Sequence, residues 1–223
     1  MDILLHPVDA RATIDNLVKA VEQGRLTEQR IHESVDRIMA AKKRLGLFAK
    51  RAPKAAKIDY DKHRTLAAKI AARALTAVRG EGKDIRFDRE KGVACFVLDD
   101  DGQGMGIPFT RALLRRFGTV NSTTLTPDTC GTGTEQHLGP GTSGSVVIGI
   151  FSRISASKGR SGITPKLKDA AMEILKRAKV AGVPSAVISF DSPYILDQFK
   201  DADLLIAGYD RMEAIQEAAA EML

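Results

Sequence analysis

The chain closes with GVPSAVISFDSPYILDQFKDADLLIAGYDRMEAIQEAAAEML, residues Gly182–Leu223, and this stretch decides the fold. An apolar run over Ser185–Phe190 predicts a buried strand, and Ser192-Pro193-Tyr194 predicts the turn that follows it. A short helix, a second strand over Asp203–Ala207 and an Ala- and Glu-rich helix complete the stretch. Strands that alternate with helices in this way are typical of a parallel sheet covered by helices.

The same alternation runs through the preceding hundred or so residues. Apolar or β-branched runs predict strands over Val93–Leu98, Val120–Leu125 and Ser145–Phe151. Helices are expected over Ile107–Phe117 and from Pro165 to Val180, the second with Thr164 as its cap. The sequence therefore predicts an α/β fold with a mostly parallel sheet of five to six strands and helices on both faces.

An alanine-rich segment precedes these strands. Leu66, Ile70, Ala74 and Val78 recur at helical spacing after Asp61, so a helix is expected from Asp61 until Gly80 ends it.

The first 47 residues predict one strand and two helices. Asp2–Leu5 is a short apolar run, Asp9 can cap a helix that Gly24 ends, and Thr27 can cap a second helix that closes at Leu45-Gly46. A lone strand with two helices cannot bury a core, because both edges of the strand stay unpaired. We therefore expect residues 1–47 to pack on something else.

Charge and cysteine content exclude several classes of protein. The net charge is +6, but seven Lys and Arg side chains and no acidic ones lie between Lys42 and Lys57, which leaves 6 − 7 = −1 for the remainder. This pattern predicts a basic tether over residues 48–60 and no nucleic-acid-binding face. The longest apolar run, Val146–Phe151, is far too short to span a membrane. Cys95 and Cys130 form neither a disulfide framework nor a metal-ligand spacing, so no metal or cofactor is expected.

Two glycine-rich segments invite other functional interpretations. Gly102, Gly104 and Gly106 follow a strand and precede a helix, but their spacing differs from the dinucleotide-binding fingerprint, so a tight turn is expected. The later loop carries Cys130, Glu135 and His137. Because a flexible loop fixes no geometry between a thiol and a base, a surface loop without catalytic function is expected there.

Several motifs together resemble glycoside hydrolase family 3, above all its β-N-acetylhexosaminidase branch. They are Leu26-Thr27-Glu28 with Arg30-Ile31, Leu45-Gly46-Leu47-Phe48, His63-Arg64, Phe151-Ser152-Arg153, and the closing stretch Gly182–Leu223. The resemblance implies that residues 1–47 are the last strand and helices of the catalytic (β/α)₈ barrel. It also implies that residues 48–60 are a linker and that residues 61–223 form the C-terminal α/β sandwich domain.

The resemblance further implies where catalysis takes place. Family members are retaining enzymes, and their nucleophilic aspartate and Lys-His-Phe-Pro-Gly-His-Gly loop belong to the barrel; neither segment occurs in these 223 residues. We therefore predict no catalytic residue in this chain and no activity of the chain alone. Some β-glucosidases take an acid/base glutamate from the second domain, but the sequence around Glu135 does not resemble that branch. His6, just beyond the Asp2–Leu5 strand, would line the sugar site in a complete barrel.

The implied partners are a barrel domain or subunit and a β-linked amino sugar or glucoside. The alternative is a stand-alone α/β interaction or ligand-binding module that forms a homo-oligomer through residues 1–47. No targeting segment follows Met1, which indicates a cytoplasmic protein if the chain is complete and leaves a periplasmic or secreted one open otherwise.

Overall fold

The computed structural model describes residues 1–49, 57–80, 85–130, 140–154, 159 and 162–223. The chain divides into two compact units, Met1–Ile58 and Asp59–Leu223. Most of the expected basic tether, residues 50–56, lies outside the described residues. In the described ranges, no helix is both long enough and apolar enough to cross a membrane.

The first unit contains two helices whose starting points the sequence predicts correctly. Helix α1 spans Ala10–Glu22, and the carboxylate of Asp9 accepts a hydrogen bond from the Ala12 N–H at 3.0 Å. Helix α2 spans Glu28–Arg44, and the Thr27 hydroxyl accepts one from the Arg30 N–H at 3.1 Å. In both cases a short polar side chain satisfies a backbone donor of the first turn, which has no partner within the helix.

The strand expected over Asp2–Leu5 does not form, because the described part of this unit offers no second strand to pair with it. The segment is instead tied to α2 by the Asp2 carboxylate. Its Oδ1 atom accepts hydrogen bonds from Arg30 Nη2 at 2.9 Å, Ser34 Oγ at 2.9 Å and Arg37 Nη1 at 3.0 Å. The bonds from Arg30, Ser34 and Arg37 hold the pKa of this carboxyl group well below its ordinary value.

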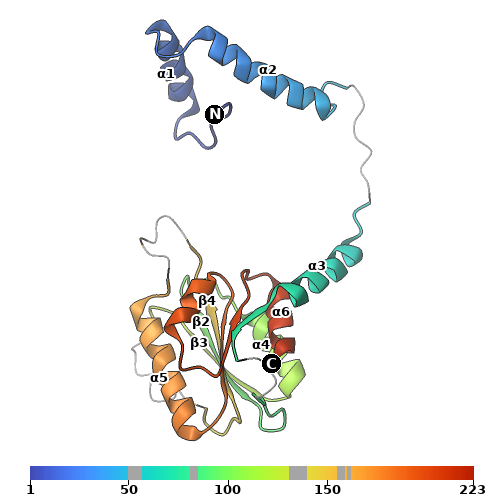
Figure 1. The fold of residues 1–223 in the computed structure, drawn as a ribbon, viewed down its shortest axis with the longest axis vertical. Helices are drawn as coiled ribbons and strands as arrows, with labels where there is room; N and C mark the ends of the chain where they lie inside the picture. The colour runs from blue at the N-terminus through green and yellow to red at the C-terminus, as the bar shows by residue number, and fades with distance from the viewer. Residues whose placement is uncertain (50–56, 81–84, 131–139, 155–158, 160–161) are drawn as a thin grey trace. The chain divides into compact units, whose positions relative to one another are not determined.

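The second unit is a six-stranded sheet with helices on both faces, which confirms the predicted fold class (Figure 1). The spatial order is β1-β6-β5-β4-β2-β3, and the neighbours from β6 to β3 are parallel. The parallel strands are β2 Val93–Asp99, β3 Val120–Leu125, β4 Val146–Phe151, β5 Ser185–Ser189 and β6 Leu204–Ala207. The helices are α3 Tyr60–Ala74, α4 Ile107–Phe117, α5 Pro165–Ala181, the 3₁₀-helix η3 Pro193–Gln198, and α6 Glu213–Met222.

The helix expected to reach Gly80 is shorter, and its last predicted turn is a strand. Helix α3 ends at Ala74, and β1, Thr76–Arg79, pairs antiparallel with β6. The helical spacing of Val78 was misleading, because β-branched Thr76 and Val78 also suit an edge strand, and β6 offers it a partner. Gly80 then turns the chain at φ 75°, where a Cβ would lie 2.2 Å from the Asp203 carbonyl oxygen.

Helix α4 begins at a turn that only glycine fits. Gly106 has φ 92°, and a Cβ there would approach Val97 Cγ1 to 2.6 Å and Phe151 Cε2 to 3.2 Å. No side chain of the turn itself caps α4. Instead the buried Gln216 side chain of α6 accepts a hydrogen bond from the Phe109 N–H at 3.1 Å, so α4 is capped by a neighbouring helix.

Each face of the sheet has its own hydrophobic core. In one core, α5 and η3 pack against the strand side chains on one face of the sheet. In the other core, α3, α4 and α6 pack against the strand side chains on the opposite face. In the second core, the Phe190 ring stacks on Phe151 at a centroid distance of 4.6 Å and meets Phe109 edge-on at 5.1 Å. Gly149 makes room for this triad, because a Cβ there would lie 3.1 Å from Phe109.

We expect Gly106→Ala to lower the free energy of unfolding of the second unit by about 3 kcal/mol, since it adds a positive-φ penalty and a clash with Val97. Gly102→Ala is the matched control, with φ 63° and nothing within 4 Å of the added Cβ, and should cost about 1 kcal/mol. Urea unfolding followed by tyrosine near-ultraviolet circular dichroism would measure both, because Tyr60, Tyr194 and Tyr209 all lie in the second unit. Equal losses in the two variants would show that the packing against Val97 is not tight.

The Asp2 contacts predict a pH dependence of the first unit. Because the pKa of this carboxyl group is lowered in the folded chain, its stabilising effect is present above about pH 4 and is lost as the pH falls further. An NMR titration should show a midpoint for Asp2 well below the ordinary value of about 3.9, and Arg30→Gln with Arg37→Gln should return it toward that value. An ordinary midpoint in the unaltered chain would contradict the contacts.

Candidate functional site

The carboxyl ends of the parallel strands meet where the chain changes direction in the sheet. From β2 the chain passes through α4 to β3 on one side, and from β4 it passes through α5 to β5 on the other side. Helices α4 and α5 pack on opposite faces. Open α/β sheets bind ligands at such a switch point, outside the carboxyl ends of the strands. We call this region, formed by the residues that follow β2, β4, β5 and β6, the carboxyl edge.

Asp100 fastens the end of β2 to the start of α5. Its Oδ2 atom accepts a hydrogen bond from Ser152 Oγ at 3.0 Å, and its Oδ1 atom accepts one from the Thr164 N–H at 2.9 Å. Asp100 and Ser152 are both buried. The expected N-cap Thr164 thus precedes α5, but its side chain makes no capping bond. Asp100 therefore connects three segments of the carboxyl edge.

Asp191 and Arg211 form a partly buried ion pair at this edge. Asp191 Oδ1 accepts from Arg211 Nη2 at 2.7 Å and from Nε at 3.1 Å, while its Oδ2 accepts from the Ser152 N–H at 3.0 Å. Arg211 Nη2 also reaches Asp101 Oδ2 at 3.5 Å. Burial by itself would lower the pKa of Arg211, but the hydrogen bonds and charges of Asp191 and Asp101 outweigh it and raise that pKa.

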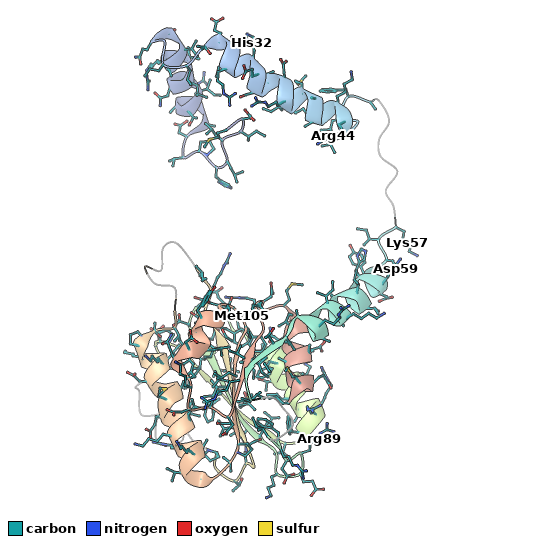
Figure 2. All side chains as sticks on the ribbon, in the orientation of Figure 1. His32, Arg44, Lys57, Asp59, Arg89 and Met105 are labelled. Atoms are coloured by element: carbon teal, nitrogen blue, oxygen red, sulfur yellow. The ribbon has the colours of Figure 1, made fainter. Side chains whose placement is uncertain are left out.

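The glycine-rich turn after β2 is closed by a carboxylate and offers no phosphate cradle. Asp99 Oδ2 accepts hydrogen bonds from the Gly104 N–H at 2.7 Å and the Met105 N–H at 3.1 Å; Figure 2 labels Met105 at this end of the unit. A phosphate would need these two donors and would meet the negative charge of Asp99. The tight-turn interpretation of residues 101–106 therefore agrees with the structure.

The carboxyl edge exposes two tyrosines. Tyr194 lies in η3 after β5 and is 80% exposed, and Tyr209 follows β6 and is half exposed. Tyr209 has φ 65°, which is uncommon for a bulky residue, and its hydroxyl contacts Thr76 Oγ1 at 3.1 Å. Strained backbone often marks functional sites. The sequence places Tyr194 in the turn expected after the Ser185–Phe190 strand, and Gly208-Tyr209 directly follows the strand expected over Asp203–Ala207.

The other residues singled out from the sequence belong to different parts of the chain. His6 lies exposed in the first unit with φ 54°, and its binding of a sugar stays a prediction. Glu135 and His137 lie outside the described residues. Cys130 is buried, and its thiol donates to the Lys166 carbonyl oxygen at 3.4 Å. Complete burial raises the pKa of the Cys95 thiol to about 12. The described ranges contain no group of three side chains suited to hold a metal ion.

Solved structures of glycosidases share this fold. A glycoside hydrolase family 3 β-N-acetylglucosaminidase from Paenibacillus sp. str. FPU-7 has a TM-score of 0.67 and 22% identity over 94% of this chain and 40% of its own. The β-glucoside phosphorylase BglX has a TM-score of 0.70 and 20% identity over 99% of this chain and 40% of its own. A β-glucosidase from Listeria innocua has a TM-score of 0.64 and 16% identity over 93% of this chain and 32% of its own.

Neither the protein-family models nor the curated protein sequences gave a match. The chain spans at most 40% of the length of the three solved enzymes, and identities of 16–22% establish the fold alone. The second unit accordingly has the α/β fold of the C-terminal domain of family 3 enzymes.

We expect Arg211→Met to lower the free energy of unfolding by about 1–3 kcal/mol, because it removes the guanidinium that donates to Asp191 in a partly buried site. Arg115→Met is the matched control. Arg115 meets Glu217 at the same distance of 2.7 Å, but both side chains are largely exposed, so the loss should stay below about 1 kcal/mol. Urea unfolding at pH 7 would measure the free energy of unfolding of both variants. Equal losses would show that the Asp191–Arg211 pair stabilises the fold no more than an exposed ion pair does.

Proposed function

We propose that these 223 residues are the C-terminal portion of a retaining family 3 glycoside hydrolase. The observation that carries this proposal is the extent of the structural similarity, which covers 93–99% of the chain in the three solved enzymes and so includes both units. The sequence pattern around Thr27 and around Leu45–Phe48 supports the same assignment for the first unit, independently of the sheet.

The first unit exposes many large apolar side chains. Of its helical residues only Ala20 is buried, while Val21, Ile31 and Ile38 are half-buried. Exposed apolar side chains in such number indicate a surface that another element covers. We assign that cover to a catalytic barrel. Its exposed large apolar side chains among the described residues are Met1, Ile3, Leu4, Leu5, Val8, Ile14, Leu17, Val18, Val35, Met39, Leu45, Leu47, Phe48 and Ile58.

The carboxylates of the second unit are poor candidates for the chemistry. A retaining glycosidase needs two groups about 5–5.5 Å apart that face one glycosidic bond. Asp99 closes a turn, Asp100 fastens α5, and Asp191 holds Arg211. Each of these carboxylates is already bound in the fold. In this proposal the barrel supplies the nucleophile and the acid/base, His6 lines its sugar site, and the second unit supports them.

The proposed substrate is a β-linked N-acetylamino sugar. The Paenibacillus enzyme and a fungal family 3 enzyme with a TM-score of 0.68 are β-N-acetylglucosaminidases, whereas the Listeria enzyme is a β-glucosidase. The sequence from Phe151 through Arg153 into the Pro165 helix favours the first kind.

The test is an assay of the pure 223-residue chain with an aryl β-N-acetylglucosaminide and an aryl β-glucoside. We expect no turnover above background from the chain alone, because the proposal assigns the nucleophile and the acid/base to the barrel. We expect turnover of the N-acetylglucosaminide when the chain is co-expressed with a family 3 barrel. Turnover by the chain alone would refute the proposed division of roles.

Sedimentation of the same samples tests what covers the first unit. Binding to the barrel should depend on the apolar side chains, so Leu17→Asp with Val35→Asp should abolish it, while Lys62→Gln on exposed α3 should leave it unchanged. A stable homodimer that does not bind the barrel would instead favour a stand-alone interaction module that oligomerises through residues 1–47.

A further inference from the structure

A basic cavity lies at the end of the sheet opposite the carboxyl edge. It has a volume of about 670 Å³ and is bounded by the end of β1, the segment after residue 84, the α5–β5 turn and the η3–β6 turn. Ser185 and Asp203, at the amino ends of β5 and β6, line it. Arg89, labelled in Figure 2, lies near the same end of the unit, far from Met105. We call this cavity the amino-edge cavity.

Hydrogen bonds fix the walls of the amino-edge cavity. Asp203 Oδ2 accepts from the Ser185 N–H at 2.8 Å and from Ser185 Oγ at 2.9 Å, which joins the starts of β5 and β6. The Arg79 guanidinium donates to the Lys200 carbonyl oxygen and so holds the η3–β6 turn against β1. These bonds connect β1, the η3–β6 turn and the starts of β5 and β6 around the amino-edge cavity.

Cations outnumber carboxylates around the amino-edge cavity. The lining that the described residues supply includes four cations, Arg79, Arg86, Lys179 and Lys200, against two carboxylates, Asp201 and Asp203, a balance of 4 − 2 = +2 for these residues. Among the described residues none of the four cations forms an ion pair. The carboxyl end of α5 adds a partial negative charge at this edge, but it amounts to only about half a unit charge.

Unpaired cations around a formed cavity indicate an anionic ligand. The planar guanidinium groups of Arg79 and Arg86 offer paired N–H donors that match phosphate oxygens, and lysines add point charges. The volume falls in the range of about 300–1,000 Å³ that is usual for small-molecule sites. Asp201 adds a carboxylate that can accept hydrogen bonds from ligand hydroxyl groups.

We propose that the amino-edge cavity binds a phosphorylated small molecule of sugar size, held through its phosphate by Arg79, Arg86, Lys179 and Lys200. This site is separate from the carboxyl edge and does not depend on the proposed glycosidase function.

Isothermal titration calorimetry of the 223-residue chain with inorganic phosphate, glucose 6-phosphate and glucose tests the proposal. Glucose 6-phosphate should bind more tightly than phosphate, and glucose should not bind measurably. The double variant Arg86→Gln, Lys200→Gln should weaken glucose 6-phosphate binding roughly tenfold, since two exposed ionic contacts are lost. Added salt should weaken binding in the unaltered chain, because the contacts are ionic.

The matched control is Lys62→Gln, Lys69→Gln, which removes the same charge from exposed positions of α3. It should leave the affinity for glucose 6-phosphate unchanged, because neither side chain lines the amino-edge cavity. Absence of binding at millimolar glucose 6-phosphate would overturn the proposal. Equal weakening by the two double variants would overturn it as well, because only net charge would then matter.

Discussion

The pairing of β2 with β4 is the constraint on which the second unit depends. All residues of both strands are buried, because α5 covers one face of the sheet and α4 with α6 covers the other. A strand covered on both faces has no exposed position for a polar side chain along its length. Functional groups must therefore lie beyond the strand ends. Asp100 and Ser152 meet in this way directly after β2 and β4, at a distance of 3.0 Å.

This constraint also explains which parts of the fold the sequence predicts. Buried parallel strands appear as continuous apolar runs, and both β2 and β4 are such runs, so their existence and extent could be inferred directly. Helix starts with Asp9 or Thr27 are equally local, since the cap and the donor it satisfies are three residues apart. Edge elements are different. The sequence pattern predicts a helix where β1 forms, because the conformation of β1 is set by its pairing with β6, about 130 residues away in the chain.

The site required information that no local pattern carries. Asp191 and Arg211 follow different strands, and only the parallel neighbours β5 and β6 bring them to 2.7 Å. The capping of α4 by Gln216 is similar, since donor and acceptor are 107 positions apart. Gln216 also donates to the Arg211 carbonyl oxygen at 2.6 Å. The Gln216 side chain thus links the start of α4 to Arg211, the cation that pairs with Asp191. The pattern of small residues in α6 does not reveal this link.

The two ends of the sheet differ in how their charged side chains are paired, and this difference separates what each can bind. At the carboxyl edge Asp101 and Asp191 pair with Arg211, whereas Arg79, Arg86, Lys179 and Lys200 line the amino-edge cavity without an ion pair among the described residues. A neutral sugar gains little from unpaired cations, but a phosphate is attracted to them. The central strands hold the two ends apart at a fixed distance, so an anion at the amino edge does not compete for the groups of the carboxyl edge.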